Sequence, residues 1–200
     1  MGKTEAIVLK TSPYGDYNQI VTFYTQDFGL VKCAAKFSRS PKNRLSSLLT
    51  PFNELEAHFL LRNRDLETLQ SAALIHPHLE LRSSLETLEA ASLCLDALLK
   101  TQLPGKSAPL LYALLRKYLT LIPEAASPEA LSASFLLKLL KHEGVLAFEE
   151  DNFLPGFSRD NAAILLSLGI AGSGSFLKEI EPPKETLEIA KELFDRLIIK

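Results

Sequence analysis

The chain has 200 residues, 46% of them hydrophobic and 23% charged, and this composition excludes a disordered, collagen-like or disulfide-framework protein. The formal net charge of −2 is unevenly spread, because residues 1–75 carry 9 Lys and Arg against 7 Asp and Glu, whereas residues 76–200 carry 13 against 17. No apolar run reaches the ~20 residues that span a bilayer and the first residues lack a secretory leader pattern, so we expect a cytoplasmic protein whose two cysteines are reduced.

The first part of the chain has the pattern of five short strands. Apolar, β-branched or aromatic segments separated by turn residues such as Pro13, Gly15 and Gly29 predict strands over residues 6–10, 19–25, 29–36, 54–61 and 66–72. In the fourth segment Leu55, Ala57 and Phe59 alternate with acidic residues and His58, which indicates a half-buried strand.

The period changes to a helical one from about residue 77. Apolar residues at helical spacing predict helices over residues 84–102, 109–122, 127–144, 159–169 and 184–199, while residues 151–159 and 171–175 have the composition of loops. The third helix carries its own signals, with Ser127 as the N-cap, Pro128 at the first helical position and Gly144 as a stop.

Strands followed by helices, without alternation, predict an α+β chain with a barrel domain at residues 1–75 and a helical domain at residues 76–200. A barrel of five strands in this length is typical of an OB-fold, which commonly binds oligonucleotides on one face and its loops.

A basic run follows the third predicted strand. Residues 29–46 contain Lys32, Lys36, Arg39, Lys42 and Arg44 and no acidic residue, so this run is either a solvated loop or a contact surface for an anionic ligand. Residues 1–75 also hold 8 of the 16 Tyr and Phe residues. Tyr14, Tyr17, Tyr24 and Phe37 are candidates for base stacking, the alternative being that they belong to the barrel core.

Residues 14–69 contain an ordered set of residues: Thr25, Gly29, Ala35, Lys36, Arg39, Leu49, Pro51, Phe52, Thr68 and Leu69. This set resembles the N-terminal domain of the RecO family of bacterial recombination mediators, in which these residues occupy matching positions. Residues 134–145 resemble the family's central helix, and residues 185–198 its terminal helix.

The chain departs from the family pattern at three places. Many members carry a four-cysteine zinc element between those two helices, but residues 146–157 contain no cysteine, so we expect no zinc. Phe37 replaces a glycine that commonly follows the Ala-Lys pair. Ser134 replaces a basic residue often found before the central phenylalanine, which puts the position of a partner's acidic tail in question.

The resemblance implies a protein that binds single- and double-stranded DNA, anneals complementary strands, and helps replace single-strand binding protein (SSB) with the recombinase RecA, together with RecR. The nucleic-acid-binding candidates are then Lys32, Lys36, Arg39, Lys42, Arg44, Arg62, Arg64, Tyr14 and Phe37. An apolar pocket edged by cations would suit the C-terminal tail of SSB, with candidates Phe135, Lys138, Leu139, Lys141 and Arg116; the alternative is that the apolar members are bundle core and the cations its solvent face.

We expect no enzymatic activity and no cofactor or metal ion. The sequence has no recognisable pairing of a nucleophile with a base and no glycine-rich phosphate loop, and His58, His76, His78 and His142 have no metal-ligand spacing. Two other functions stay open. One is a protein-docking adaptor without significant DNA binding, and the other is an RNA-binding OB module, because phosphate contacts alone do not distinguish RNA from DNA.

Overall fold

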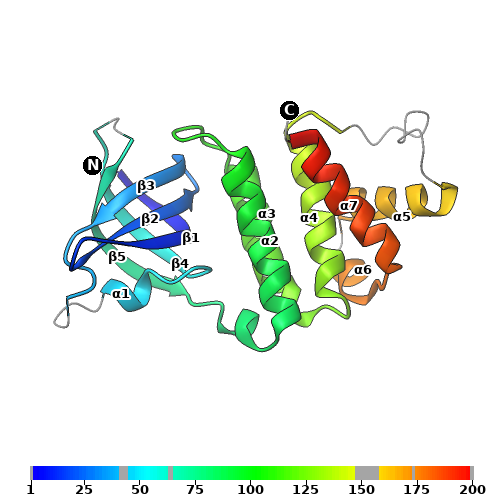
Figure 1. The fold of residues 1–200 in the computed structure, drawn as a ribbon, viewed down its shortest axis with the longest axis horizontal. Helices are drawn as coiled ribbons and strands as arrows, with labels where there is room; N and C mark the ends of the chain where they lie inside the picture. Colours follow the sequence, from blue (N-terminus) through cyan, green and yellow to red (C-terminus); the bar gives the residue numbers. More distant parts are fainter. Residues whose placement is uncertain (1, 41–44, 63–64, 147–157, 173, 199–200) are drawn as a thin grey trace. The chain divides into compact units, whose positions relative to one another are not determined.

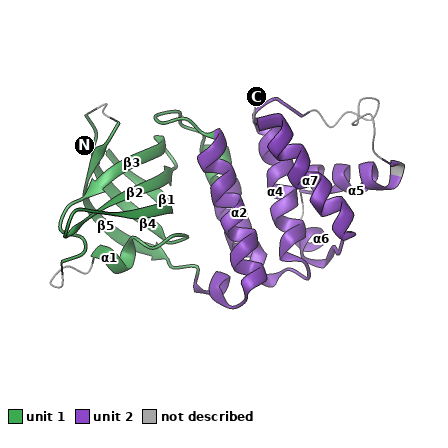
Figure 2. Cartoon of the chain, in the orientation of Figure 1, with its two compact units in different colours: residues 1–78, 102–113 green, residues 79–101, 114–200 purple. Residues whose placement is uncertain are grey.

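The computed structural model describes residues 2–40, 45–62, 65–146, 158–172 and 174–198 (Figure 1). Contacts divide the chain into two compact units (Figure 2). Unit 1 comprises residues 1–78 and 102–113, and unit 2 comprises residues 79–101 and 114–200. Unit 1 therefore contains the strands together with a second segment of chain that returns to them.

Unit 1 is built on a closed barrel with the strand order β1-β2-β3-β5-β4. The strands are β1 (Gly2–Tyr14), β2 (Asn18–Thr25), β3 (Gly29–Ala35), β4 (Glu54–Leu60) and β5 (Glu67–His76). β1 pairs with β2 along one edge and with β4 along the other, while β3 and β5 close the barrel through a short parallel pairing. The predicted five-stranded OB-fold is confirmed.

Two strands are longer than their sequence signals. β1 continues through Pro13, which pairs with Gln19, to Tyr14, so Pro13 belongs to a strand end rather than to the predicted turn. β5 extends to His76. A short helix that the sequence did not indicate, α1 (Leu45–Leu48), lies between β3 and β4.

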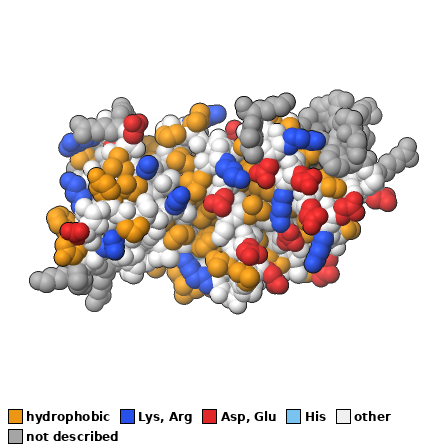
Figure 3. Space-filling view, in the orientation of Figure 1, with side chains coloured by type: hydrophobic (Ala, Val, Ile, Leu, Met, Phe, Trp, Pro, Cys, Tyr) orange, Lys and Arg blue, Asp and Glu red, His pale blue; other side chains and the backbone are white. Residues whose placement is uncertain are grey.

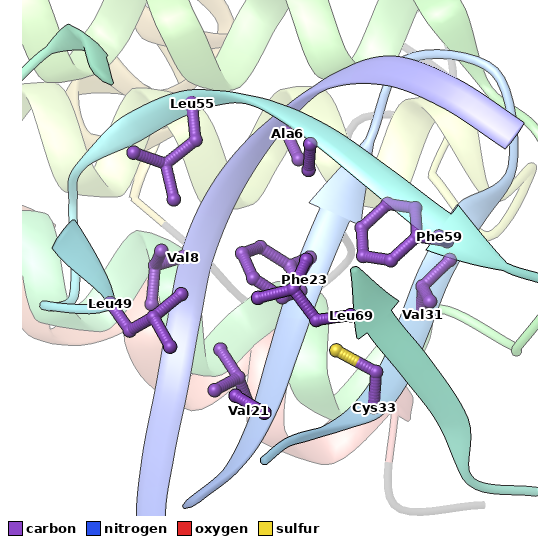
Figure 4. Packing of buried hydrophobic residues seen from close by; sticks show 12 residues of the cluster. Ala6, Val8, Val21, Phe23, Val31, Cys33, Leu49, Leu55, Phe59 and Leu69 are labelled. Carbon is purple, nitrogen blue, oxygen red and sulfur yellow. The ribbon is translucent and has the colours of Figure 1, made fainter. Parts of the chain in front are cut away.

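The barrel interior is filled by side chains from all five strands, as Figure 4 shows. Phe23 of β2 and Phe59 of β4 meet edge to face with 5.4 Å between ring centroids. Leu49, which follows α1, joins the same buried cluster. Burial of these side chains stabilises the barrel.

One flank of the barrel is covered by the returning segment of unit 1. The Tyr24 hydroxyl donates to Oε1 of Gln102 at 3.4 Å, and the Tyr112 hydroxyl donates to Oε1 of Glu54 at 3.1 Å. Glu54 is consequently buried, although its alternation with Leu55 had indicated the solvent side of a half-buried strand. Its carboxylate is accommodated because a covering element supplies a hydrogen-bond donor.

Unit 2 is helical and has α4 (Pro128–His142) at its centre, in contact with α2 (Leu85–Thr101), α5 (Arg159–Ile170) and α7 (Lys184–Ile198). α3 (Pro109–Leu121) begins in unit 1 and ends in unit 2. Short 3-10 turns, η1 (Leu79–Arg82) and η2 (Ile122–Glu124), precede α2 and α4. The helical class of this part of the chain is confirmed.

The ends of α4 follow the sequence signals. The Ser127 hydroxyl accepts a hydrogen bond from the backbone N–H of Ala130, Pro128 is the first helical residue, and Gly144 has a φ of 72° just beyond the end. Besides α1, the sequence did not predict a second short helix. α6 (Gly174–Glu179) begins inside residues 171–175, so the prediction of a loop there is wrong for its last two residues. The other predicted loop, residues 151–159, lies largely outside the described residues.

Candidate nucleic-acid interface

The returning segment leaves one side of the barrel uncovered, and we call this side the open flank. A row of paired residues carries two lysines across it. Lys10 of β1 pairs with Thr22 of β2, and Thr22 pairs with Lys32 of β3. Directly paired residues project from the same face of a sheet, and two strand spacings separate the outer members by ~10 Å. Both lysines are exposed, so this flank presents two cations in one row, with Thr22 between them.

The row contrasts with another outer row of the same barrel. Ile7 pairs with Tyr24 on one side and with Glu54 on the other, and all three residues are buried. One part of the outer surface of the barrel is therefore covered and another part is open. The predicted nucleic-acid-binding cations within the described residues lie at exposed positions. Tyr24 was a stacking candidate, but it is 0% exposed and cannot reach a base, so that interpretation is wrong.

The basic loop after β3 continues the open flank. Lys36 follows the last residue of β3, and Lys36, Phe37 and Arg39 are all exposed. The backbone N–H of Arg39 donates to the carbonyl of Tyr17 at 2.9 Å, and Arg39 Nη1 donates to the carbonyl of Gly15 at 3.5 Å. These contacts hold the loop against the turn between β1 and β2.

Exposed aromatic rings lie on the same two segments. Tyr14 is 54%, Tyr17 52% and Phe37 65% exposed. Tyr14 is the Cα partner of Asn18, whose side-chain oxygen accepts the backbone N–H of Phe37 at 2.9 Å. Tyr14 and Phe37 were predicted site residues, and the structure brings their backbones together through Asn18. We call Tyr14, Tyr17, Lys36, Phe37 and Arg39 the barrel tip.

The remaining nucleic-acid candidates are less defined. Arg62 is exposed, and its backbone N–H donates to Oε2 of Glu67 at 2.8 Å. Lys42, Arg44 and Arg64 lie outside the described residues. Lys10 is not among the site residues predicted from the sequence. Strand register is the signal that aligns it with Lys32.

Charge on the barrel is not uniform around its circumference. On the β1 and β4 side, Lys3 Nζ lies 2.9 Å from Oε2 of Glu56, and this ion pair lowers the pKa of the Glu56 carboxyl. Glu5 is the Cα partner of Glu56 on that side. On the face drawn in Figure 3, acidic side chains concentrate over unit 2, whereas unit 1 shows mainly basic and hydrophobic ones. A polyanion would therefore be attracted to the open flank of unit 1.

The partner-binding candidates of unit 2 separate into buried and exposed groups. Phe135 and Leu139 are fully buried, and the Phe135 ring packs edge to face on Tyr118 with 5.5 Å between centroids. These two side chains belong to the helical core rather than to an open apolar pocket, which corrects the predicted pocket. Arg116 and Lys141 are exposed.

Lys138 occupies an intermediate position on α4. Its Nζ donates to the carbonyl of Ala171 at 2.5 Å and lies 5.3 Å from the centroid of the Tyr118 ring. Burial, with smaller contributions from the neighbouring Lys117 and Lys141, lowers the pKa of Lys138 to about 8. Lys117 Nζ donates to the carbonyl of Gly172 at 3.2 Å, so two ammonium groups bind successive carbonyls after α5.

Ser134, the departure from the family pattern on α4, has a structural role. It is buried, its hydroxyl donates to the carbonyl of Leu168 on α5 at 2.6 Å, and it lies 2.7 Å from the Tyr118 hydroxyl on α3. A hydroxyl that joins three helices leaves no room there for an exposed cation.

The described residues contain no group of three or more His, Cys, Asp or Glu side chains arranged to hold a metal ion. Cys33 and Cys94 are both buried, and burial raises the pKa of Cys33 to about 12 and that of Cys94 further still. Neither thiol has thiolate character at neutral pH. Among the described helices, none combines the length and apolar character needed to cross a bilayer.

The closed barrel with one open basic and aromatic flank defines an OB-fold protein with a helical unit attached. Comparison with known proteins gives the family. Residues 1–78 match the family model described as Recombination protein O N terminal, so this part of the chain belongs to the family of RecO N-terminal domains.

Three curated relatives illustrate the similarity. The DNA repair protein RecO of Syntrophus aciditrophicus is 36% identical over 143 residues, which cover 71% of this chain and 55% of the relative. Those of Bacillus mycoides and Bacillus cytotoxicus are 32% and 31% identical over 139 residues, covering 69% of this chain and 55% of each relative. The chain thus spans about half the length of the curated relatives that it matches.

Proposed function

We propose that this chain acts in DNA repair as a recombination mediator that binds single- and double-stranded DNA without sequence preference. The observation that carries the proposal is the open flank of the barrel, where the Lys10, Thr22 and Lys32 row leads to Lys36, Arg39 and exposed aromatic rings. Cations on this flank bind phosphates and release counterions, and exposed rings stack on bases. The family and the names of its relatives support DNA as the ligand.

The same flank supports annealing of complementary strands. A strand held through its phosphates leaves its bases available to a second strand, and positive charge on the barrel reduces the repulsion between the two backbones. This function needs no catalytic group, so we propose a binding protein and not an enzyme.

We further propose that unit 2 provides the protein contacts through which the recombinase RecA is loaded onto SSB-coated strands with RecR. The exposed Arg116 and Lys141 would receive the acidic C-terminal tail of SSB by charge, and Lys141 lies close enough to Lys138 to lower its pKa. Phe135 and Leu139 are buried and would contribute only by holding α4 in place. Titration with a fluorescent SSB tail peptide tests this, and an affinity that Arg116→Ala with Lys141→Ala does not change would refute the assignment.

DNA binding is tested by titrating the protein into a fluorescent single-stranded oligomer at several salt concentrations. Because each phosphate contact contributes a slope near −0.7, Lys32→Gln with Lys36→Gln should weaken binding and reduce the magnitude of the salt slope by about 1.4. Lys184→Gln with Arg196→Gln removes two positive charges from exposed positions of unit 2 and should leave the slope unchanged.

The control also separates the alternatives. Equal effects of the two double variants would mean that overall charge, not the open flank, governs binding. No binding by the wild type at low salt, with SSB or RecR still captured, would favour a docking adaptor. Stronger competition by RNA than by DNA oligomers would favour an RNA-binding module.

A further inference from the structure

Phe37 is an exposed aromatic residue in an unfavourable backbone conformation. Its φ is 54°, in the left-handed region that side chains other than glycine rarely adopt, and its side chain is 65% exposed. Little burial compensates for this conformation, so neither local propensity nor packing explains a phenylalanine here. Such outliers tend to occur at binding sites, where the surrounding structure imposes them.

Hydrogen bonds on both sides impose this conformation. Asn18 Oδ1 accepts the Phe37 N–H at 2.9 Å, and the Phe37 carbonyl accepts the Ser40 N–H at 3.1 Å. The next contact along the loop is the Arg39 N–H to the Tyr17 carbonyl at 2.9 Å. The backbone of Phe37 is thus fixed between the β1–β2 turn and its own loop, while the ring projects into solvent.

The neighbours of Phe37 define what its ring can bind. Lys36 and Arg39 flank it in sequence, and both are exposed cations. Tyr17 supplies another exposed ring on the segment to which the loop is bonded. Cations beside exposed rings match a ligand that offers phosphates and planar bases together. In a duplex the faces of interior bases are covered by their neighbours, whereas a single strand can turn a base onto a ring.

We propose that Phe37, positioned by Asn18, stacks on unpaired bases and makes the barrel tip selective for single-stranded over double-stranded DNA. The inference rests on the proposed DNA binding and assigns different roles to the cations and to Phe37. Lys10, Lys32, Lys36 and Arg39 bind the phosphates of either form, and Phe37 discriminates between them.

The test compares the affinities of wild type and Phe37→Gly for a single-stranded oligomer and for a duplex of equal length, in the full chain. Loss of one stacked base should weaken single-strand binding roughly five- to hundredfold, with duplex affinity and the salt slope unchanged. The melting temperature should not fall, because glycine adopts a φ of 54° without steric cost. Phe37→Tyr retains the ring and should retain the single-strand affinity.

Asn18→Ala tests the positioning role. It leaves the ring and all cations in place but removes the acceptor of the Phe37 N–H, so the ratio of single-strand to duplex affinity should fall toward that of Phe37→Gly. A ratio equal to wild type in Asn18→Ala would remove Asn18 from the proposal.

The outcomes distinguish this inference from the proposed function. If the wild type binds DNA and Phe37→Gly changes single-strand and duplex affinities equally, or changes neither, the stacking role is overturned while DNA binding stands. If the wild type binds neither form at low salt, both proposals fail.

Discussion

At the scale of single residues, Lys138 is half-buried, and the fold disfavours its charged form. Its ammonium group contacts the Ala171 carbonyl and the Tyr118 ring, yet burial and two neighbouring lysines lower its pKa to about 8 from 10.5. Between these pH values the unfolded chain holds a proton on this lysine that the folded chain has released. The free energy of unfolding should therefore rise with pH between about 8 and 10.5. Below about pH 8 the lysine is charged in both states, and its charge should destabilise the folded chain.

Lys138→Met should consequently flatten the dependence of the free energy of unfolding on pH from about 8 to about 10.5. Urea unfolding across this range checks the slope, which is more informative than the absolute stability because methionine also loses the bond to Ala171. Lys184→Gln, at an exposed position of unit 2, is the control and should keep the wild-type slope. Equal slopes in wild type and Lys138→Met would show that Lys138 titrates normally in the folded chain.

At the scale of elements, the start of β3 shows how a family residue can serve packing rather than binding. Gly29 has a φ of 65°, and a Cβ there would lie 2.0 Å from the carbonyl oxygen of Lys106 in the returning segment of unit 1. Thr25 supports the same turn, since its hydroxyl donates to the Gly29 carbonyl at 2.8 Å and accepts the Phe28 N–H at 3.0 Å. Both residues therefore belong to the junction between the barrel and its cover.

Gly29→Ala should lower the free energy of unfolding by about 2–4 kcal/mol, because left-handed strain adds to a backbone clash. Gly105→Ala is a matched control, since Gly105 has a φ of 74° but a Cβ there would meet no atom within 4 Å, and it should cost about 1 kcal/mol. Urea unfolding of both variants measures the difference, which is due to the close approach alone. Equal costs would mean that the returning segment moves aside without penalty.

The strands were predictable because a barrel buries one side of each strand, and alternation such as that of Leu55, Ala57 and Phe59 records this directly. The burial of Glu54 was not predictable in the same way. Its donor, Tyr112, lies 58 residues away in sequence, and local alternation carries no information about a distant cover. The short helices α1 and α6 escaped for a related reason, since neither is long enough to show a helical period.

The candidate site was likewise predictable where the local sequence determines exposure, and unpredictable where distant parts of the chain determine it. Lys32, Lys36 and Arg39 were found from composition because a run of like charges is rarely buried. Tyr24 and Phe135 looked equally suitable by residue type, yet both are core, and only tertiary packing separates them from the exposed Tyr14 and Phe37. The glycine that Phe37 replaces in the family pattern is a sign of an unusual backbone conformation at this position. The sequence alone did not connect Phe37 with Asn18.

At the scale of the whole molecule, the barrel is not complete in one stretch of sequence. The family model ends at residue 78, but unit 1 also includes residues 102–113, which α2 separates from the strands. Tyr24 and Glu54 are buried on the outside of the barrel and are bonded to Gln102 and Tyr112. Ile7, buried in the same row, lies between them. The open flank that carries the basic row is thus defined by what the returning segment leaves uncovered.

A fragment of residues 1–78 should therefore be less stable than the barrel in the full chain, by about 3 kcal/mol or more, because it exposes large apolar side chains and leaves the Glu54 carboxylate without its tyrosine donor. Hydrogen exchange of the strand amides, compared between fragment and full chain, measures this loss. Tyr112→Phe in the full chain keeps the cover and removes one hydrogen bond, so it should cost only about 1–2 kcal/mol. Strand amides protected equally in the fragment and in the full chain would mean that the barrel is stable without its cover, and that the boundary at residue 78 is also the limit of an independent folding unit.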